Sequence, residues 1–166
     1  METSRIGFRH WDEQDLPLAE RLWGDPAVTR YICASGAFSS EEIAARLKLE
    51  IENQVQHGIQ YWPIFEKGTG DLIGCCGFRP TRSEGVAELG FHLRPAFWGK
   101  GLATEAANAA IRYGFDSLGL RALEAGHNPK NTASKHCLEK LGFVYVQDVY
   151  YAPTGLMHPT FRMQHN

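Results

Sequence analysis

The sequence predicts a single α/β domain with one mixed, mostly antiparallel sheet of about seven strands, a central parallel pair and about four flanking helices. Its 166 residues suit one domain with a substantial core. Closely spaced strand patterns predict antiparallel hairpins, whereas a strand–helix–strand run over residues 86–127 predicts the parallel pair. No repeat, low-complexity segment or linker divides the chain, so we expect one domain over residues 1–166.

The elements are expected in the order β-α-α-β-β-β-α-β-α-β-β. Two helices have recognisable starts: Asp15 is a candidate cap before Pro17, and Ser39 stands three residues before Glu42, the spacing of a capping box. An apolar face follows that box at helical spacing, formed by Ile43, Leu47 and Ile51. A hairpin turn is expected at residues 68–71. Strands are predicted at 5–11, 61–67, 71–80, 86–95, 121–127, 143–151 and 156–164, and helices at 12–25, 39–55, after Gly101, and 131–142.

Composition excludes several classes of protein. The net charge of -2 argues against a broad nucleic-acid surface, and no apolar run approaches the roughly 18 residues of a membrane span. The N-terminus lacks the apolar core of a signal peptide. The cysteines form no C-x-x-C pair and the seven histidines show no zinc spacing, so we expect a metal-free cytoplasmic protein with free thiols at Cys33, Cys75, Cys76 and Cys137.

Two glycines at a helix entrance predict an anion site. Gly99 and Gly101 lie where backbone amides have no partner within the helix and the helix dipole concentrates roughly half a positive charge. Without side chains here, a phosphate can approach several N–H groups together, with Thr104 adding a hydroxyl and Lys100 a positive charge. The helix itself has a small, closely packing face: Ala103, Ala107, Ala110, Ile111 and Gly114.

Three phosphate ligands compete for this turn. The segment "GKGLATEA" does not supply the G-x-x-x-x-G-K-[ST] of a Walker A loop. A dinucleotide fingerprint needs a third glycine where Thr104 stands, and it normally follows an opening strand. The third ligand is coenzyme A.

The block "WGKGLA", residues 98–103, resembles the pyrophosphate loop of the GNAT superfamily of acetyl-CoA-dependent N-acetyltransferases, Q/R-x-x-G-x-G/A, with Trp98 in the Q/R position. A second block, "NPKNTASKHCLEKLGF" at 128–143, resembles the next motif of that family, and element order agrees over nearly the whole chain. With the aromatic Trp98 in this position, the block most resembles the branch of the family that acetylates the N-termini of ribosomal proteins. The resemblance implies an acetyl-CoA site formed by Phe91, Leu93, Trp98, Gly99, Lys100, Gly101, Ala103, Thr104 and Asn131.

Glu88 is the candidate general base. Strand alternation places it on one face with Gly90 and His92, and the resemblance implies a glutamate here that orders water near the amine. A carboxylate within an apolar strand needs a partner or a function. The alternatives are a structural pair with Arg79 or Arg82, or His92 as the base.

Ser134 is the candidate acid for the departing thiolate. It lies in the first turn of a helix that Asn131 can cap, on the side of Cys137 and Leu138. Many relatives carry a tyrosine at the position of Leu138, whereas the ribosomal branch implicates the serine. The alternatives are a tolerated small residue, or a tyrosine of the last strands acting instead: Tyr145, Tyr150 or Tyr151.

The expected function is acetyl transfer from acetyl-CoA to a primary amine, with a protein N-terminal α-amine as the first-ranked acceptor. An α-amine with a pKa near 8 is about 10% neutral at pH 7, against about 0.04% for lysine, so it demands less of a base. A small amine (polyamine, amino acid or aminoglycoside) and a non-catalytic coenzyme A sensor are the rivals. An acidic cleft would favour a polyamine and a wide groove a peptide. The sequence leaves open whether the chain forms a homodimer. Four aromatic residues are candidates for the acceptor site: Tyr31, Phe38, Trp62 and Trp98.

Overall fold

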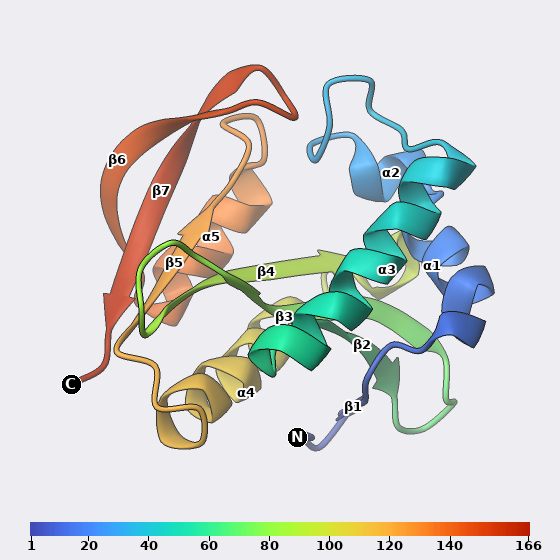
Figure 1. The fold of residues 1–166 in the computed structure, drawn as a ribbon, viewed down its shortest axis with the longest axis horizontal. Coiled ribbons are helices and arrows are strands. Elements are labelled where there is room, and N and C mark those ends of the chain that lie inside the picture. The colour runs from blue at the N-terminus through green and yellow to red at the C-terminus, as the bar shows by residue number, and fades with distance from the viewer.

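A computed structural model describes all residues from 1 to 166. Its strands form one seven-stranded sheet in the order β1-β2-β3-β4-β5-β7-β6 (Figure 1). The β4–β5 pair is parallel and every other neighbouring pair is antiparallel, which confirms the predicted mixed sheet. The strands are β1 (Ile6–Phe8), β2 (Tyr61–Glu66), β3 (Leu72–Pro80), β4 (Val86–Leu93), β5 (Ala122–Gly126), β6 (Val144–Tyr151) and β7 (Leu156–Gln164).

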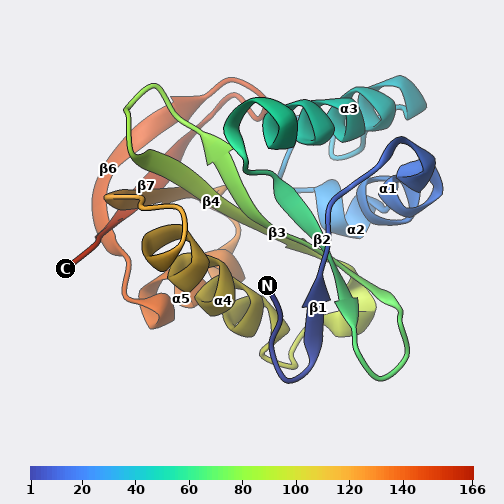
Figure 2. The same ribbon diagram turned by 60° about the horizontal axis from the view of Figure 1, so that its bottom comes forward.

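Helices cover both faces of the sheet (Figure 2). One face carries α1 (Leu16–Trp23), α2 (Pro26–Thr29) and α3 (Ser40–His57), and the other carries α4 (Leu102–Asp116) and α5 (Thr132–Leu141). The larger core, 21 buried residues, joins the sheet to α4 and α5, and a second core of 9 residues joins it to α1 and α3. None of these helices combines the length and the apolar character that crossing a bilayer requires.

The predicted helix at 12–25 is a 3₁₀ turn (Glu13–Asp15) followed by α1, and a further short helix, α2, begins just beyond it at Pro26. Asp15 occupies the predicted N-cap position of α1, but its side chain does not cap that helix. Its carboxylate accepts the Asp12 amide at 2.9 Å and binds both guanidinium nitrogens of Arg9 at 2.6 and 2.9 Å. The four-residue helix α2 is too short for a periodic pattern of apolar residues to predict it from the sequence. The capping box of Ser39 and Glu42 is confirmed, with bonds of 3.2 and 2.7 Å.

The parallel pair separates after three residues, and this separation creates the site. Pairing runs from Val86–Ala122 to Glu88–Glu124 and then ends, because β5 continues along β7 as far as Gly126. The Arg94 amide donates to Ile73 on β3, so strand alternation directs the peptide groups of Leu89, Phe91 and Leu93 away from β3. The second half of β4 therefore presents an open backbone edge where β5 has departed.

Candidate active site

A cavity of about 870 Å³ lies where β4 and β5 diverge. It is bounded by β4, the first turns of α4 and α5, the β6–β7 hairpin and the region from α2 to α3. Of the predicted site residues only Lys100 is outside its lining; the side chain of Lys100 is exposed, with Nζ 5.5 Å from the centre of the Phe97 ring. The lining includes Glu88, Phe91, Leu93, Trp98, Gly99, Gly101, Ala103, Thr104, Asn131 and Ser134.

The glycine turn needs glycine for its backbone as well as for space. Gly99 and Gly101 have φ values of 71° and 75°, the left-handed region that a side chain disfavours. Gly101 is the N-cap of α4 and supplies no side-chain cap, so the amides of the first turn stay open as donors. The Arg5 guanidinium donates to the Lys100 carbonyl at 3.0 Å and pairs with Glu105, which fixes the turn from behind.

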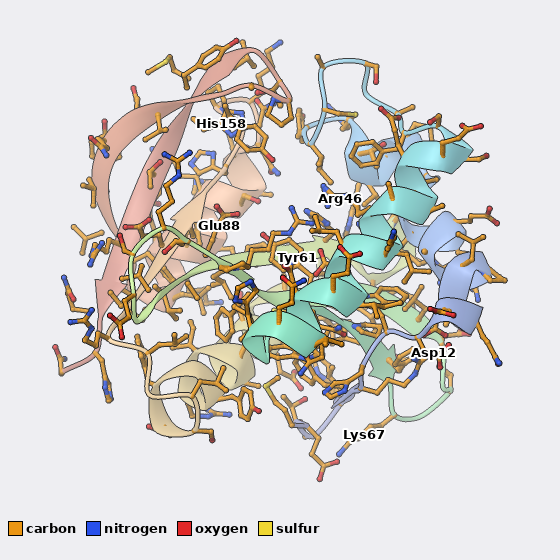
Figure 3. All side chains as sticks on the ribbon, in the orientation of Figure 1. Asp12, Arg46, Tyr61, Lys67, Glu88 and His158 are labelled. Carbon is orange, nitrogen blue, oxygen red and sulfur yellow. The ribbon has the colours of Figure 1, made fainter.

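Glu88 is exposed and hydrogen-bonded, but not to an arginine. The Tyr61 hydroxyl donates to Glu88 Oε1 at 3.1 Å (Figure 3). Arg79, the pairing partner left open by the sequence, instead binds the fully buried Glu50 at 2.6 Å. A Cβ at Gly90 would lie 2.3 Å from the Tyr61 ring and hydroxyl, so the glycine between Glu88 and His92 makes room for that ring.

Tyr61 holds its proton firmly. Burial raises the pKa of its hydroxyl well above the ordinary value, and the nearby negative charge of Glu88 raises it further. Arg79 stacks on the ring at 4.4 Å, and Glu50 accepts the Tyr61 amide at 2.7 Å. Tyr61 is therefore a fixed donor that orients one oxygen of Glu88 and leaves the other free to accept a proton.

His92 is unsuited to act as the base. The Trp23 indole, which can only donate, bonds to His92 Nδ1 at 3.1 Å, so in the neutral ring the proton lies on Nε2. Burial lowers the pKa of His92 well below its ordinary value, and the positive charges of Arg46 and Arg79 lower it further. The ring is thus neutral with its basic nitrogen occupied.

Ser134 has a hydroxyl proton free to donate. Asn131 caps α5 by accepting the Ser134 amide at 3.1 Å, and its Nδ2 donates to Ser134 Oγ at 3.1 Å. With the oxygen lone pair engaged, the O–H can point into the cavity. Burial raises the pKa of the nearby Cys137 thiol, which does not favour a nucleophilic thiolate.

The remaining aromatic candidates divide between cavity and core. Tyr151, Tyr31 and Trp98 line the cavity, with the Trp98 indole donating to the Leu93 carbonyl at 2.8 Å. Tyr145 donates to Asp148, and it and Tyr150 are exposed outside the lining. The other two pack away from the cavity: Phe38 and Trp62.

The side chains of the cavity lining that sequence reasoning missed include Arg46, Tyr61 and His127. His127 follows β5; its Nδ1 bonds to the Asn128 carbonyl at 2.7 Å and its buried Nε2 has no partner. Nothing in the local sequence marks Arg46, one of several polar residues on α3, or Tyr61, which begins a buried strand. Only the β2–β3–β4 register brings Tyr61 level with Gly90, two residues from Glu88 on β4.

No group of three or more His, Cys, Asp or Glu side chains is arranged to hold a metal ion. What the cavity does offer is an uncapped helix N-terminus joined to an open strand edge. An anionic group followed by an amide-containing chain fits such a surface.

One solved structure shows the fold alone, at 18% identity. It is a spermidine N-acetyltransferase from Vibrio cholerae in complex with CoA and spermine, with a TM-score of 0.80 over 98% of this chain and 96% of the other.

Sequence comparisons identify the family. The "Uncharacterized N-acetyltransferase p20" of Bacillus licheniformis is 33% identical over 142 residues, 85% of this chain and 80% of its own. The [ribosomal protein uS5]-alanine N-acetyltransferase of Escherichia coli is 32% identical over 101 residues, 60% of this chain and 52% of its own. The family model for the acetyltransferase (GNAT) domain matches residues 5–144. The chain belongs to the GNAT family of N-acetyltransferases, enzymes that use acetyl-CoA.

Proposed function

We propose that this acetyltransferase acts on the α-amine of a protein N-terminus, with Glu88 as general base and Ser134 as general acid. One observation carries the proposal. Glu88, oriented by Tyr61, and Ser134, oriented by Asn131, line a single cavity that also reaches the open first turn of α4.

The residues of the glycine turn would hold the pyrophosphate of acetyl-CoA. Gly99, Gly101 and the first amides of α4 present donors and a positive dipole end, and Thr104 adds a hydroxyl. The open peptide groups of Phe91 and Leu93 would hold the amides of the pantetheine arm. Because the Leu93 carbonyl already accepts a hydrogen bond from the Trp98 indole, Leu93 would contribute its backbone N–H. Acetyl-CoA supplies the activated acetyl group, and the chain supplies position and proton transfer.

Glu88 would accept the proton that the amine loses as it attacks, directly or through one water molecule. A carboxylate is a weak base for lysine but an adequate one for an α-amine that is already about 10% neutral at pH 7. Tyr61 donates to Oε1 and so leaves Oε2 available to accept that proton.

Ser134 would donate its proton toward the departing thiolate. Asn131 Nδ2 polarises the serine oxygen and fixes its position, so the hydroxyl needs no rearrangement during the reaction. Leu138, buried in the cavity lining, presents no group that could do this. Tyr151 is the tyrosine of the last strands that reaches the lining and is the next candidate.

The charges of the cavity bear on the choice of acceptor. Four arginines line it, against two glutamates: Arg30, Arg46, Arg79 and Arg162, against Glu88 and Glu124. A polyamine carries several positive charges and would be repelled, although a structural neighbour is a spermidine N-acetyltransferase. The E. coli relative named as an alanine N-acetyltransferase of ribosomal protein uS5 supports a protein N-terminus instead.

The test is thiol release by purified protein with acetyl-CoA against three acceptor panels: peptides with free N-termini, the same peptides already N-acetylated, and small amines including spermidine. We expect turnover on the free peptides, none on the blocked ones, and mass spectrometry placing the acetyl group on the α-amine. Turnover confined to spermidine or another small amine would contradict the proposed acceptor. Binding of acetyl-CoA with no turnover on any panel would favour the sensor.

A further inference from the structure

Of the four arginines that line the cavity, Arg46 makes no side-chain hydrogen bond within the protein, whereas the side chains of Arg30, Arg79 and Arg162 each make at least one. None of the three guanidinium nitrogens of Arg46 donates a hydrogen bond within the protein, and no carboxylate lies within 4.0 Å. Nη1 is also shut off from solvent. By contrast, Arg79 and Arg162 are each paired at 2.6 Å with a glutamate. A buried, unsatisfied donor is costly, so a guanidinium left this way indicates a missing partner.

The position of Arg46 is fixed even though its hydrogen bonds are unmade. Its guanidinium carbon lies 4.9 Å from the centre of the Phe38 ring and 5.4 Å from that of Trp23. Two aromatic contacts hold the side chain without using its N–H groups. Arg46 is thus preorganised for a ligand rather than folded onto the surface.

The surroundings of Arg46 favour an anion. Burial lowers the pKa of Arg46 from its ordinary value, and the positive charge of Arg79 lowers it further. His92 adds no negative charge and carries an Nε2–H donor. The carboxylate of Glu50 is already paired with Arg79 and accepts the Tyr61 amide. This end of the cavity therefore presents donors and positive charge.

Three side chains in sequence link Arg46 to the proposed base. Trp23, beneath Arg46, bonds to His92; the His92 ring meets the Tyr61 ring edge to face at 5.8 Å; and Tyr61 bonds to Glu88. Figure 3 shows Arg46, Tyr61 and Glu88 between α3 and the β6–β7 hairpin. A carboxylate on the same carbon as the α-amine lies next to it, whereas an acidic side chain of the second residue lies roughly 3.5 Å farther along the peptide.

We propose that Arg46 binds an acidic side chain of the acceptor, so that the preferred substrate is a polypeptide with Asp or Glu as its second residue. The inference rests on the proposed function, since it takes Glu88 as the position of the reacting amine. The carboxylate would accept from Arg46 and satisfy the donors that the protein leaves open.

The test compares kcat/KM for peptides that differ only at residue two: Ala-Asp, Ala-Asn and Ala-Lys. We expect wild-type enzyme to prefer the Asp peptide over the Asn peptide by roughly ten- to hundredfold, and Arg46→Met to reduce that ratio to about one. Arg46→Lys should keep part of the preference, and Arg30→Met, which removes another arginine of the lining, should keep all of it.

Three outcomes overturn the inference. Equal rates on the Asp and Asn peptides would do so while leaving the proposed function intact. So would an equal loss on both peptides in a folded Arg46→Met enzyme, its fold being checked by thermal melting. Turnover of free amino acids in place of peptides would overturn the inference and the proposed acceptor together.

Discussion

The two ends of the cavity are built in different ways. The proposed coenzyme A end comes from one continuous stretch, residues 86–142, and offers mainly backbone groups: the first amides of α4 and the open edge of β4. The proposed acceptor end is assembled from segments distant in the sequence and offers side chains such as Arg46, Tyr61 and Tyr151. Backbone groups suit a cosubstrate that stays the same. Side chains can be substituted without disturbing the fold, and such substitutions can alter which acceptor is bound.

Glu88 lies where the two ends meet, and its replacement by Gln should have the largest effect. The amide keeps the shape and the bond from Tyr61 but cannot accept a proton, so we expect kcat to fall about a hundredfold. The KM for acetyl-CoA should stay nearly unchanged, because only proton transfer is lost. Glu124→Gln, the same change at the residue of β5 that pairs with Glu88, is the matched control. Full turnover by a folded Glu88→Gln enzyme would exclude Glu88 as the base.

Ser134→Ala should have the next largest effect. Protonation of the thiolate belongs to the transition state, so kcat and kcat/KM should fall together, with the KM for acetyl-CoA nearly constant. Coenzyme A is a tolerable leaving group unaided, so we expect the low end of general-acid catalysis, on the order of tens to a hundredfold. Steady-state kinetics at varied acetyl-CoA measures this. Wild-type kcat would remove the serine from the mechanism and make Tyr151→Phe the next variant.

Gly101→Val tests the other end of the cavity. The side chain would obstruct the open amides and oppose a φ of 75°, so acetyl-CoA affinity should weaken at least tenfold, about 1.4 kcal/mol. Backbone strain alone is controlled by Gly119→Val, whose φ is 67° and which lies outside the cavity lining. Calorimetry decides between them. Equal affinities in the two folded variants would contradict the pyrophosphate site.

Asp15→Asn should have the smallest effect, and it falls on stability. The hydrogen bonds from Arg9 hold the pKa of Asp15 below its ordinary value, so its ionised form stabilises the fold. That contribution is present above the unfolded pKa near 3.9 and is lost as the pH falls through the lower folded value. We expect a loss of about 1 kcal/mol at pH 7, because Arg9 is partly exposed. Urea unfolding should show the difference shrinking below about pH 4; a difference unchanged by acid would contradict it.

Prediction from sequence succeeded for features whose signals are local. The capping box at Ser39, the small face of α4 and the cap at Asn131 each depend on residues within one or a few turns of a helix. At residues 12–25 it gave the helix and the N-cap position of Asp15, but not the pairing of the Asp15 carboxylate with Arg9. It missed α2, which is too short for a periodic pattern.

The sequence by itself determined the mixed sheet, the family and the glycine turn, because each depends on neighbouring residues or on motifs of fixed spacing. Only the tertiary structure decided that β5 leaves β4 after Glu88, that Tyr61 and not an arginine bonds to Glu88, and that Arg46 stays unpaired. Those facts depend on strand register and on how α3 packs against β2 and β3, contacts between residues tens of positions apart. Such contacts follow from filling one common core, and no short stretch of sequence encodes them.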